Sequence, residues 1–181
     1  MVTVYVGIGS NVGDSARHCE DALAALGRLP GTRLLAASPL YETEPEDGAG
    51  PQSFVNAVAG LETDRAPEAF LAALQRLEAR AGRPEERARG KNRTLDLDLL
   101  LYGDLVRQGP PLTLPHPRMH RRRFVLEPLC AVAPDALHPS LGCPVRDLLA
   151  ALGPGPAVRR LDVPAATRAG VGDAVRAGES A

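Results

Sequence analysis

The spacing of apolar and polar residues predicts a chain in which strands alternate with helices. Residues 2–8 form a short apolar run typical of a buried strand, closed by the turn-prone Gly9-Ser10-Asn11. Phe70, Leu74, Leu77 and Ala81 recur at helical spacing, and Pro67 suits the first turn of that helix. The whole pattern predicts strands at 2–8, 32–38, 54–61 and 94–102, helices at 14–26 (capped by Asp14 or Ser15) and 67–80, and short further elements at 125–129 and 145–152.

The order strand, helix, two strands, helix, strand indicates an α+β fold of the ferredoxin-like βαββαβ type. We expect an antiparallel sheet with its helices on one face and substrate-binding loops, including 42–52 and 83–92, on the other. After Gly153-Pro154-Gly155-Pro156 the sequence is rich in Ala, Gly and Arg without aromatics. We therefore expect one catalytic domain over residues 1–152 and a weakly packed C-terminal extension over 153–181.

Composition and charge exclude several classes of protein. The chain has 181 residues, a formal net charge of -1 and 44% hydrophobic residues, so no global field recruits nucleic acid or an anionic membrane. Its three cysteines lack C-x-x-C spacing, and no apolar window is long enough to span a membrane. We expect a cytoplasmic protein without a nucleic acid or membrane partner, in a monomeric or weakly dimeric state.

The most informative motif is the alternation in Thr94-Leu95-Asp96-Leu97-Asp98-Leu99-Leu100-Leu101-Tyr102. With a period of two, Leu95, Leu97, Leu99 and Leu101 share one face of the strand, while Asp96 and Asp98 share the other. Two carboxylates about 6.5 to 7 Å apart can converge on cations bridged by a polyphosphate, and without a cation they repel. Their oxygen ligands favour magnesium. The alternative is an exposed strand face whose charges are merely solvated.

Two basic clusters flank this strand, and either alone would favour a solvated basic face or an RNA-binding patch. Together with the paired aspartates they favour a polyphosphate ligand, because arginine binds phosphate oxygens bidentately. The first cluster comprises Arg83, Arg87, Arg89, Lys91 and Arg93, and the second His116, Arg118, His120, Arg121, Arg122 and Arg123.

Two phenylalanines are notable because aromatic residues make up only 3% of the chain. Phe54 precedes Asn56 and Phe124 follows Arg122, so two rings with an amide nearby can sandwich a flat heterocycle. From these residues alone, two phenylalanines buried in the core are the better interpretation. The turn at Gly7–Gly13 has neither the G-x-G-x-x-G nor the P-loop spacing, and a tight strand-to-helix turn explains it.

Taken together, these motifs resemble the hydroxymethyldihydropterin pyrophosphokinase family of folate biosynthesis. The resemblance covers roughly residues 1–150 and rests, in order, on Gly9-Ser10-Asn11, Tyr41-Glu42-Thr43-Glu44-Pro45, Phe54-Val55-Asn56, Gly82-Arg83, Arg93-Thr94-Leu95-Asp96-Leu97-Asp98, Pro115-His116 and Arg122-Arg123-Phe124. It implies transfer of the β,γ-diphosphate of ATP to the hydroxymethyl group of 6-hydroxymethyl-7,8-dihydropterin, with release of AMP.

The resemblance also implies a role for individual residues. Asp96 and Asp98 would hold two magnesium ions, and Arg83 and Arg122 would join them as catalytic residues. The pterin would contact Thr43, Pro45, Phe54, Asn56 and Phe124. The nucleotide and its phosphates would contact Gln75, Glu78, Arg93, Leu99, Thr113, His116 and Arg122.

The chain departs from the family in the segment after Arg83. Many members carry a tryptophan and a second arginine there, where this chain has Gly90 and Glu85, and Lys91-Asn92 stands where Gly-Pro is common. Arg87 or Arg89 would then take the place of the second arginine. Two other classes of function compete with the enzyme: a non-catalytic RNA-binding module, which needs no paired acids, and a metal-dependent phosphohydrolase, which needs more metal ligands.

Overall fold

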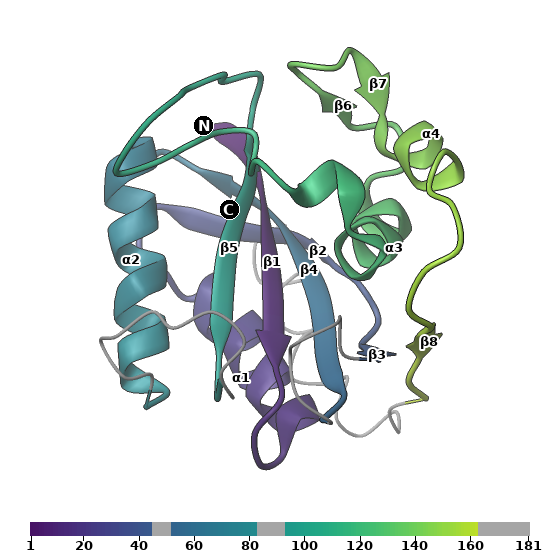
Figure 1. Ribbon diagram of the computed structural model, residues 1–181. Coiled ribbons are helices and arrows are strands. Elements are labelled where there is room, and N and C mark those ends of the chain that lie inside the picture. Colours follow the sequence, from purple (N-terminus) through teal and green to yellow (C-terminus); the bar gives the residue numbers. More distant parts are fainter. Residues whose placement is uncertain (45–51, 83–92, 163–181) are drawn as a thin grey trace.

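The computed structural model, shown in Figure 1, describes residues 1–44, 52–82 and 93–162, built around a six-stranded sheet. The sheet is antiparallel, with the order β5-β1-β4-β3-β8 and with β2 also paired to β4. Its strands are β1 (Val2–Ser10), β2 (Thr32–Ala37), β3 (Tyr41–Thr43), β4 (Phe54–Thr63), β5 (Asp96–Tyr102) and β8 (Val158–Arg160). The other elements are α1 (Ser15–Gly27), α2 (Pro67–Arg80), the short 3-10 helix η1 (Met119–Arg121), α3 (Arg123–Val132), α4 (Val145–Ala150) and the hairpin β6 (Leu137–His138) and β7 (Cys143–Pro144).

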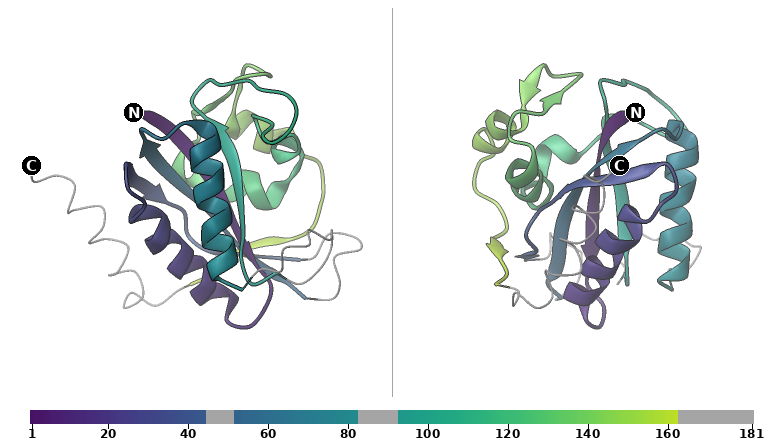
Figure 2. Two further views of the ribbon diagram at one scale, coloured as in Figure 1. Left: turned by 90° about the vertical axis from the view of Figure 1, so that its left-hand side faces the viewer. Right: turned by 180° about the vertical axis from the view of Figure 1, so that it is seen from behind.

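Helices cover both faces of this sheet. Helices α1 and α2 lie on one face, as Figure 2 shows from behind, and α3 lies on the other. The expectation that the helices pack on one face is therefore wrong for α3. The physical reason is a second core, in which Val125, Leu126 and Leu129 of α3 cluster with Val58 and Leu100 of the sheet. The rest of that face lies open and carries the candidate site.

The two predicted helices form as their patterns indicate. In α1, the side chain of Asp14 caps the helix by accepting a hydrogen bond of 3.1 Å from the backbone N–H of Arg17. In α2, Phe70 and Leu74 are fully buried, and Leu77 and Ala81 pack against the same core at their partly buried positions. The stripe predicted from the sequence thus faces the sheet.

A β-bulge interrupts the alternation of β5. Val6 of β1 pairs with Leu99, but Tyr5 pairs with Leu101, so Leu100 is an extra residue in the ladder. Leu97 and Leu99 therefore pack in the core beneath α1 and α2, whereas Leu100 and Leu101 both pack in the core beneath α3. The prediction that Leu101 shares a face with the preceding leucines is wrong for this reason.

Two strands, β3 and β8, lie in segments that the sequence did not predict as strands. Strand β3 lies partly in the predicted loop 42–52, and β8 lies in the predicted weakly packed extension. Thr43 of β3 pairs with Phe54 of β4 on one side and with Val158 of β8 on the other. The chain beyond Leu152 therefore contributes to the sheet. Within the described ranges, no helix is both long enough and apolar enough to cross a membrane.

A pair of histidines connects the β6–β7 hairpin to η1. The ring of His138 packs edge-on against that of His120, with centroids 5.7 Å apart and an interplanar angle of 82°. His120 Nε2 accepts a hydrogen bond of 3.2 Å from Nε of Arg121. The Nδ1 atoms of both histidines are buried, and neither has a hydrogen-bond partner in the described chain. Burial, and next the neighbouring His120, lowers the pKa of His138 below its ordinary value.

This pair predicts that stability falls as the solution becomes acidic. Because the pKa of His138 is lower in the folded than in the unfolded chain, the unfolded state takes up the proton first as the pH falls below about 6.5. We expect the urea midpoint to be steady from pH 8 to 7 and to drop between pH 6.5 and 5. In His138→Gln the drop should be smaller, because among the described histidines His116 alone then contributes in the same direction. An equal drop in both proteins would contradict the assignment.

Candidate active site

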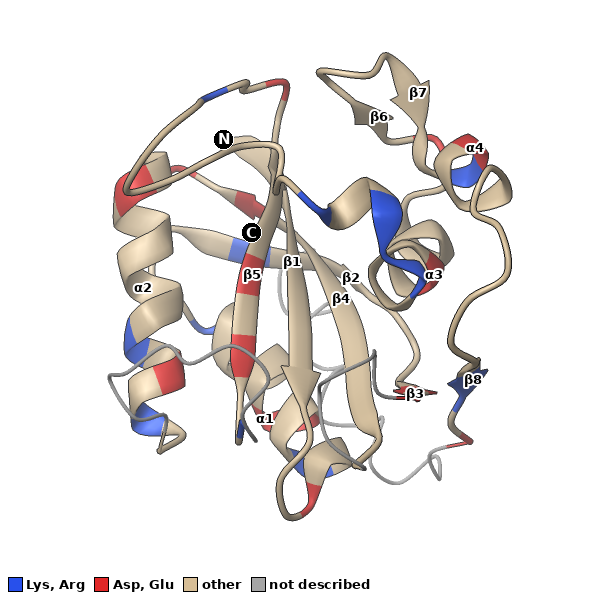
Figure 3. Cartoon of the chain, viewed as in Figure 1, with Lys and Arg blue, Asp and Glu red and all other residues tan. Residues whose placement is uncertain are grey.

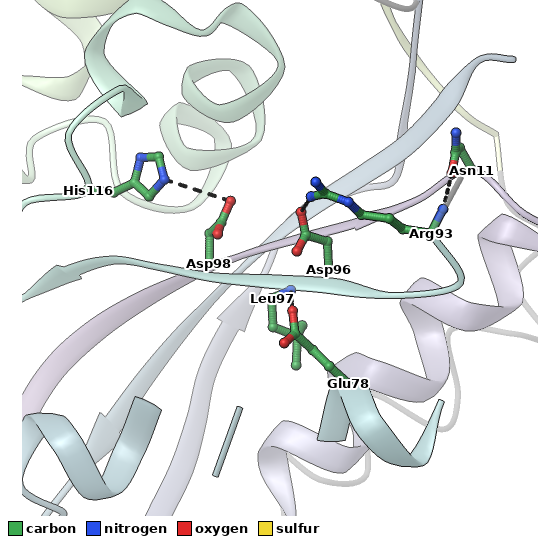
Figure 4. A network of polar contacts seen from close by, with 7 residues as sticks. All are labelled: Asn11, Glu78, Arg93, Asp96, Leu97, Asp98 and His116. Carbon is green, nitrogen blue, oxygen red and sulfur yellow. Dashed lines mark hydrogen bonds and ion pairs between the residues drawn. The ribbon is translucent and has the colours of Figure 1, made fainter. Parts of the chain in front are cut away.

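The candidate site lies on the open face of the sheet, where β5 presents its two acidic side chains. Asp96 and Asp98 project from the same side of the strand toward Arg93 and His116 (Figure 4). In Figure 3 the two red segments of β5 lie across from the blue segments around η1 and the start of α3. On β1, Gly9 pairs with Asp96 and Gly7 with Asp98, so the neighbouring strand carries no side chain beside either carboxylate.

A cavity of about 170 Å³ opens above these residues. We call its two parts the acidic half (Arg93, Asp96, Asp98, Arg122) and the aromatic half (Thr43, Phe54, Asn56, Phe124). The complete lining consists of Gly7, Ile8, Gly9, Thr43, Glu44, Phe54, Asn56, Ala57, Val58, Arg93, Asp96, Asp98, Leu100, Arg122, Phe124 and Val125.

Asp96 forms an ion pair with Arg93, and Asn11, the residue after β1, fixes the position of Arg93. The guanidinium Nη1 of Arg93 forms a hydrogen-bonded ion pair with Oδ2 of Asp96. The backbone N–H of Arg93 donates to Oδ1 of Asn11 over 2.6 Å, and the Asn11 N–H donates to the Arg93 carbonyl over 3.1 Å. Asn11 is only 5% exposed. This reciprocal pair holds the segment that leads into β5 against the end of β1.

Asp98 faces His116 across a longer gap. His116 Nε2 lies 3.9 Å from Oδ2 of Asp98, and Nδ1 accepts a hydrogen bond of 3.3 Å from the Arg118 N–H. Burial chiefly, and next the Asp96 carboxylate, raises the pKa of Asp98, while burial lowers the pKa of His116. With Nδ1 accepting, a neutral His116 carries its proton on Nε2 and directs it into the acidic half of the cavity.

Glu78 lies on the other side of β5 from the aspartates, as Figure 4 shows. Its carboxylate accepts a hydrogen bond of 2.8 Å from the backbone N–H of Leu97, at the edge of β5 that no strand covers. Glu78 is 4% exposed, so this charge-assisted bond forms away from bulk water. It fixes the backbone between the two aspartates.

The aromatic half joins β3, β4 and the start of α3. The buried side-chain amide of Asn56 donates from Nδ2 to Oγ1 of Thr43 over 2.8 Å. This bond leaves the Asn56 carbonyl oxygen and the Thr43 hydroxyl hydrogen available for a polar ligand edge. Phe54 and Phe124 line the same space, and the Arg122 guanidinium stands 5.3 Å from the centroid of the Phe124 ring. A flat polar molecule fits this combination of rings and amide.

The acidic half suits magnesium better than zinc. Two carboxylates with like charge share a partly buried site, and bound cations would offset the burial and the repulsion that together raise the pKa of Asp98. Among the residues described, no group of three or more His, Cys, Asp or Glu is placed to hold a metal. Magnesium is held by one or two carboxylates when water and substrate phosphates supply its other ligands. The donor set therefore fits a metal that arrives with a phosphate.

Comparison with known proteins decides the family. The family model described as 7,8-dihydro-6-hydroxymethylpterin-pyrophosphokinase (HPPK) matches residues 5–134, which include both halves of the cavity. The chain belongs to the HPPK family. It is thus a diphosphokinase of folate biosynthesis that acts on hydroxymethyldihydropterin.

Two bacterial members of the HPPK family match this chain over most of their own length. The 2-amino-4-hydroxy-6-hydroxymethyldihydropteridine pyrophosphokinase of Pseudomonas aeruginosa is 46% identical over 148 residues, which are 82% of this chain and 90% of that protein. The enzyme of the same name from Haemophilus influenzae is 41% identical over 140 residues, 77% of this chain and 87% of the relative. A solved HPPK-DHPS structure in complex with substrates superposes with a TM-score of 0.66 over 82% of this chain and 43% of that chain; at 14% identity it supports the fold.

The structure brings eight of the predicted site residues together around one cavity. They are the members of the acidic and aromatic halves: Thr43, Phe54, Asn56, Arg93, Asp96, Asp98, Arg122 and Phe124. His116 reaches the same place through Asp98. Pro45 and Arg83, with the whole 83–92 segment and its departures from the family, lie outside the described residues, so these assignments stay predictions.

The other predicted nucleotide contacts lie apart from the cavity lining. Gln75 is exposed on α2, and Glu78 of the same helix binds the Leu97 N–H. Leu99 is 4% exposed and its side chain packs in the core beneath α1 and α2, so the side chain is not available to a ligand. Thr113 is half-buried between Leu112 and Leu114.

The basic cluster at 116–123 separates into residues with different tasks. His116 and Arg122 belong to the site, whereas His120 packs on His138. Arg123 Nη1 pairs with Glu127 over 3.2 Å, and its Nη2 donates to backbone carbonyls of the C-terminal segment. The structure thus places two of the six members at the acidic half of the cavity, and their contact with a polyphosphate stays a prediction.

Three further residues shape the site without having been predicted. Gly7 and Gly9 keep the floor of the cavity bare, and Asn11 positions Arg93. The signal for the glycines was present in the sequence, because they alternate with Val6 and Ile8 at a strand period and so share a face. The contact of Asn11 joins residues 82 positions apart, and local sequence carries no signal for it.

The bare floor predicts that a single methyl group impairs binding. A Cβ added at Gly9 would lie 3.0 Å from Oδ1 of Asn56, a contact that displaces the amide from Thr43. Overpacking of this kind costs about 1–3 kcal/mol, so we expect Gly9→Ala to raise the KM of the pterin about tenfold. The KM of the nucleotide should change little. Gly27→Ala at the end of α1 is the control, and equal effects of both changes would contradict this account.

Proposed function

We propose that the chain transfers the β,γ-diphosphate of ATP to the hydroxymethyl oxygen of 6-hydroxymethyl-7,8-dihydropterin, giving AMP and the pterin diphosphate. The observation that carries the proposal is the shared cavity: paired carboxylates stand at one end and two rings with an amide at the other. One end suits a metal-bound diphosphate and the other a flat heterocycle. Membership of the HPPK family supports the same reaction.

The acceptor would bind in the aromatic half. A pterin ring carries hydrogen-bond donors and acceptors along one edge, which match the Asn56 carbonyl oxygen and the Thr43 hydroxyl. Phe54 and Phe124 would pack against its faces, and Pro45 would add to this contact from the segment that follows β3. Such a position directs the hydroxymethyl group toward the acidic half of the cavity.

The diphosphate would bind in the acidic half. Two magnesium ions held by Asp96 and Asp98 would supply neutralisation of the charge on the phosphate oxygens. Arg122 and Arg93, which line the same cavity, would donate to those oxygens, and the Nε2–H of His116 would add a neutral donor. Arg83 would join from its own segment. These residues align the acceptor oxygen with phosphorus, and alignment and charge stabilisation account for most of the catalysis of phosphoryl transfer.

The nucleoside would bind along the open edge of β5. The Leu97 N–H points to this edge, where Glu78 accepts its hydrogen bond. Groups two residues apart point to the same edge of a strand, so the Leu99 N–H is directed at this edge as well, although Leu99 as a whole is only 4% exposed. Recognition of the base through the Leu99 backbone, with Gln75, Glu78 and Thr113 as further contacts, would fit a leucine whose side chain is buried.

The two competing functions fit these features less well. An RNA-binding sheet would present its rings beside basic residues, but here the Asp96 and Asp98 carboxylates line the same cavity as the rings, and they repel a phosphate that arrives without metal. A phosphohydrolase built on protein metal ligands needs a larger set than Asp96 and Asp98 provide among the described residues.

The direct test of the function mixes the full chain with ATP, magnesium and the reduced pterin and measures AMP. We expect AMP and pterin diphosphate in equal amounts, and very little AMP when the pterin is omitted. Formation of ADP, or pterin-independent hydrolysis of ATP, would contradict the proposal. Tight RNA binding without AMP formation would support the binding module in its place.

The carboxylate pair predicts a specific loss on neutralising one member. Asp98→Asn keeps the shape of the side chain and removes a charge that would hold metal. We expect the rate of AMP formation to fall by a factor on the order of 100 to 1,000, with a metal-free melting temperature no lower than that of the unmodified chain, because the repulsion from Asp96 is removed. Asp104→Asn, an exposed acid just beyond β5, is the matched control and should retain activity. Retention of activity by Asp98→Asn would remove this residue from the mechanism.

A further inference from the structure

We propose that residues 153–161, which we call the strap, position the wall of the pterin-binding half of the cavity. This inference rests on the proposed function, because it assigns the aromatic half to the pterin. According to this inference, the strap is a positioning element of the active site. Its target is β3, the strand that carries Thr43.

Strand β3 depends on the strap for one of its two edges. It has three residues, and on its inner edge it pairs with β4, where Thr43 lies opposite Phe54. On its outer edge Glu42 pairs with Arg159, through both the backbone register and a side-chain ion pair. So short a strand gains little from its own residues, and its position depends on its neighbours.

Backbone hydrogen bonds at both ends extend this pairing. The Glu44 N–H donates to the Ala157 carbonyl over 3.1 Å, and the Leu161 N–H donates to the Leu40 carbonyl over 2.8 Å. The Ala157 N–H also approaches the Glu44 carboxylate at 3.4 Å. The strap therefore holds the chain from Leu40 to Glu44, which includes two residues that line the cavity.

The beginning of the strap is fixed to the opposite wall. Nη2 of Arg123 donates to the carbonyls of Leu152 and Gly153 over 3.3 and 3.2 Å. Arg123 begins α3 and is followed at once by Phe124, whose ring lines the aromatic half. One segment thus connects α3, which carries Phe124, with β3, which carries Thr43; both lie beside β8 in Figure 1.

A second cavity shows that this wall is thin. It encloses about 210 Å³ between the strap and the first cavity, and Gly153–Pro156 form part of its lining. Thr43, Glu44 and Phe124 line both cavities, so these residues are the partition between them. Because these residues have a cavity on both sides, their position depends on the elements that hold the ends of this wall. Here these elements are the strap and β4.

The strap adds little to the hydrophobic core, which separates its positioning task from general stability. Arg159 and Arg160 are exposed, Val158 is half-buried, and Leu161 reaches the edge of the main core. An exposed ion pair such as Glu42–Arg159 contributes about 0–1 kcal/mol. We therefore expect its loss to change the geometry of the aromatic half more than the melting temperature.

Two adjacent positions supply a matched pair of variants in the full chain. Backbone groups of Ala157 and Leu161 form hydrogen bonds with Glu44 and Leu40, at the two ends of β3. Backbone groups two residues apart point to the same edge of a strand, so the Arg159 N–H also points at β3 and the Arg160 N–H points away from it. Proline removes the N–H, and it is tolerated on an edge strand where that group faces solvent. Arg159→Pro should thus detach β8 from β3, whereas Arg160→Pro should leave the pairing in place.

The test measures the affinity of each variant for hydroxymethyldihydropterin, by calorimetry with magnesium and a non-hydrolysable ATP analogue, and for the analogue alone. We expect Arg159→Pro and a chain ending at Leu152 to bind the pterin about tenfold more weakly or worse, because small displacements in a site have large effects. Their affinity for the analogue should be unchanged. Arg160→Pro and a chain ending at Asp162 should match the full chain.

Three outcomes would overturn the inference. Wild-type pterin affinity in Arg159→Pro would show that the strap is not needed. Equal loss of pterin and nucleotide affinity with a lower melting temperature would show a purely structural role. Absence of pterin binding by the unmodified full chain would contradict the proposed function itself. Measuring this chain beside the variants distinguishes that case from a failure of the inference about the strap.

Discussion

The repulsion between two carboxylates on one strand is the constraint on which this structure depends. Asp96 and Asp98 project from the same face of β5, and burial with this like charge raises the pKa of Asp98. On an ordinary strand, acidic side chains that share a face would lie in solvent or would be separated by a neutral side chain on that face. Here the surroundings are arranged for charge balance instead: Arg93 pairs with Asp96, His116 faces Asp98, and the paired positions on β1 are glycines that leave space for a ligand. Even the backbone between the aspartates is fixed from behind, by Glu78.

The second half of the site follows from where the sheet continues. Beyond β1, strand β4 carries Phe54 and Asn56 into the same cavity, and β3 adds Thr43 as the partner of Asn56. Helix α3 completes the wall with Phe124, because its apolar side packs on Val58 and Leu100. In the proposed function, a diphosphate on one side and a flat acceptor on the other would thus share a single floor of glycines. The elements that hold this floor and its walls come from the whole length of the described chain, up to β8.

Sequence patterns predicted the parts of this arrangement that depend on local periodicity. The apolar run of β1, the stripe of α2 and the alternation at Asp96 and Asp98 each repeat often enough to fix a face, and the structure has them as predicted. The patterns failed where contacts between segments distant in the sequence determine the secondary structure. Strands β3 and β8 are three residues each and form because they pair with each other and β3 with β4. The bulge at Leu100 is a property of the β1–β5 register, and it turns Leu101 to the other core.

The site shows the same division. The family motifs identified the residues around the cavity, but not the way each is held, since Asn11 and the strap act over long stretches of chain. The central claim is that the Asp96/Asp98 pair exists to hold divalent metal for a diphosphate. Counting manganese ions bound to the chain by electron paramagnetic resonance, with and without a non-hydrolysable ATP analogue, tests this claim most directly. The account predicts two ions per chain with the analogue and weaker binding without it, and a loss of bound metal in Asp98→Asn. Two tightly bound ions that persist in Asp98→Asn would contradict it.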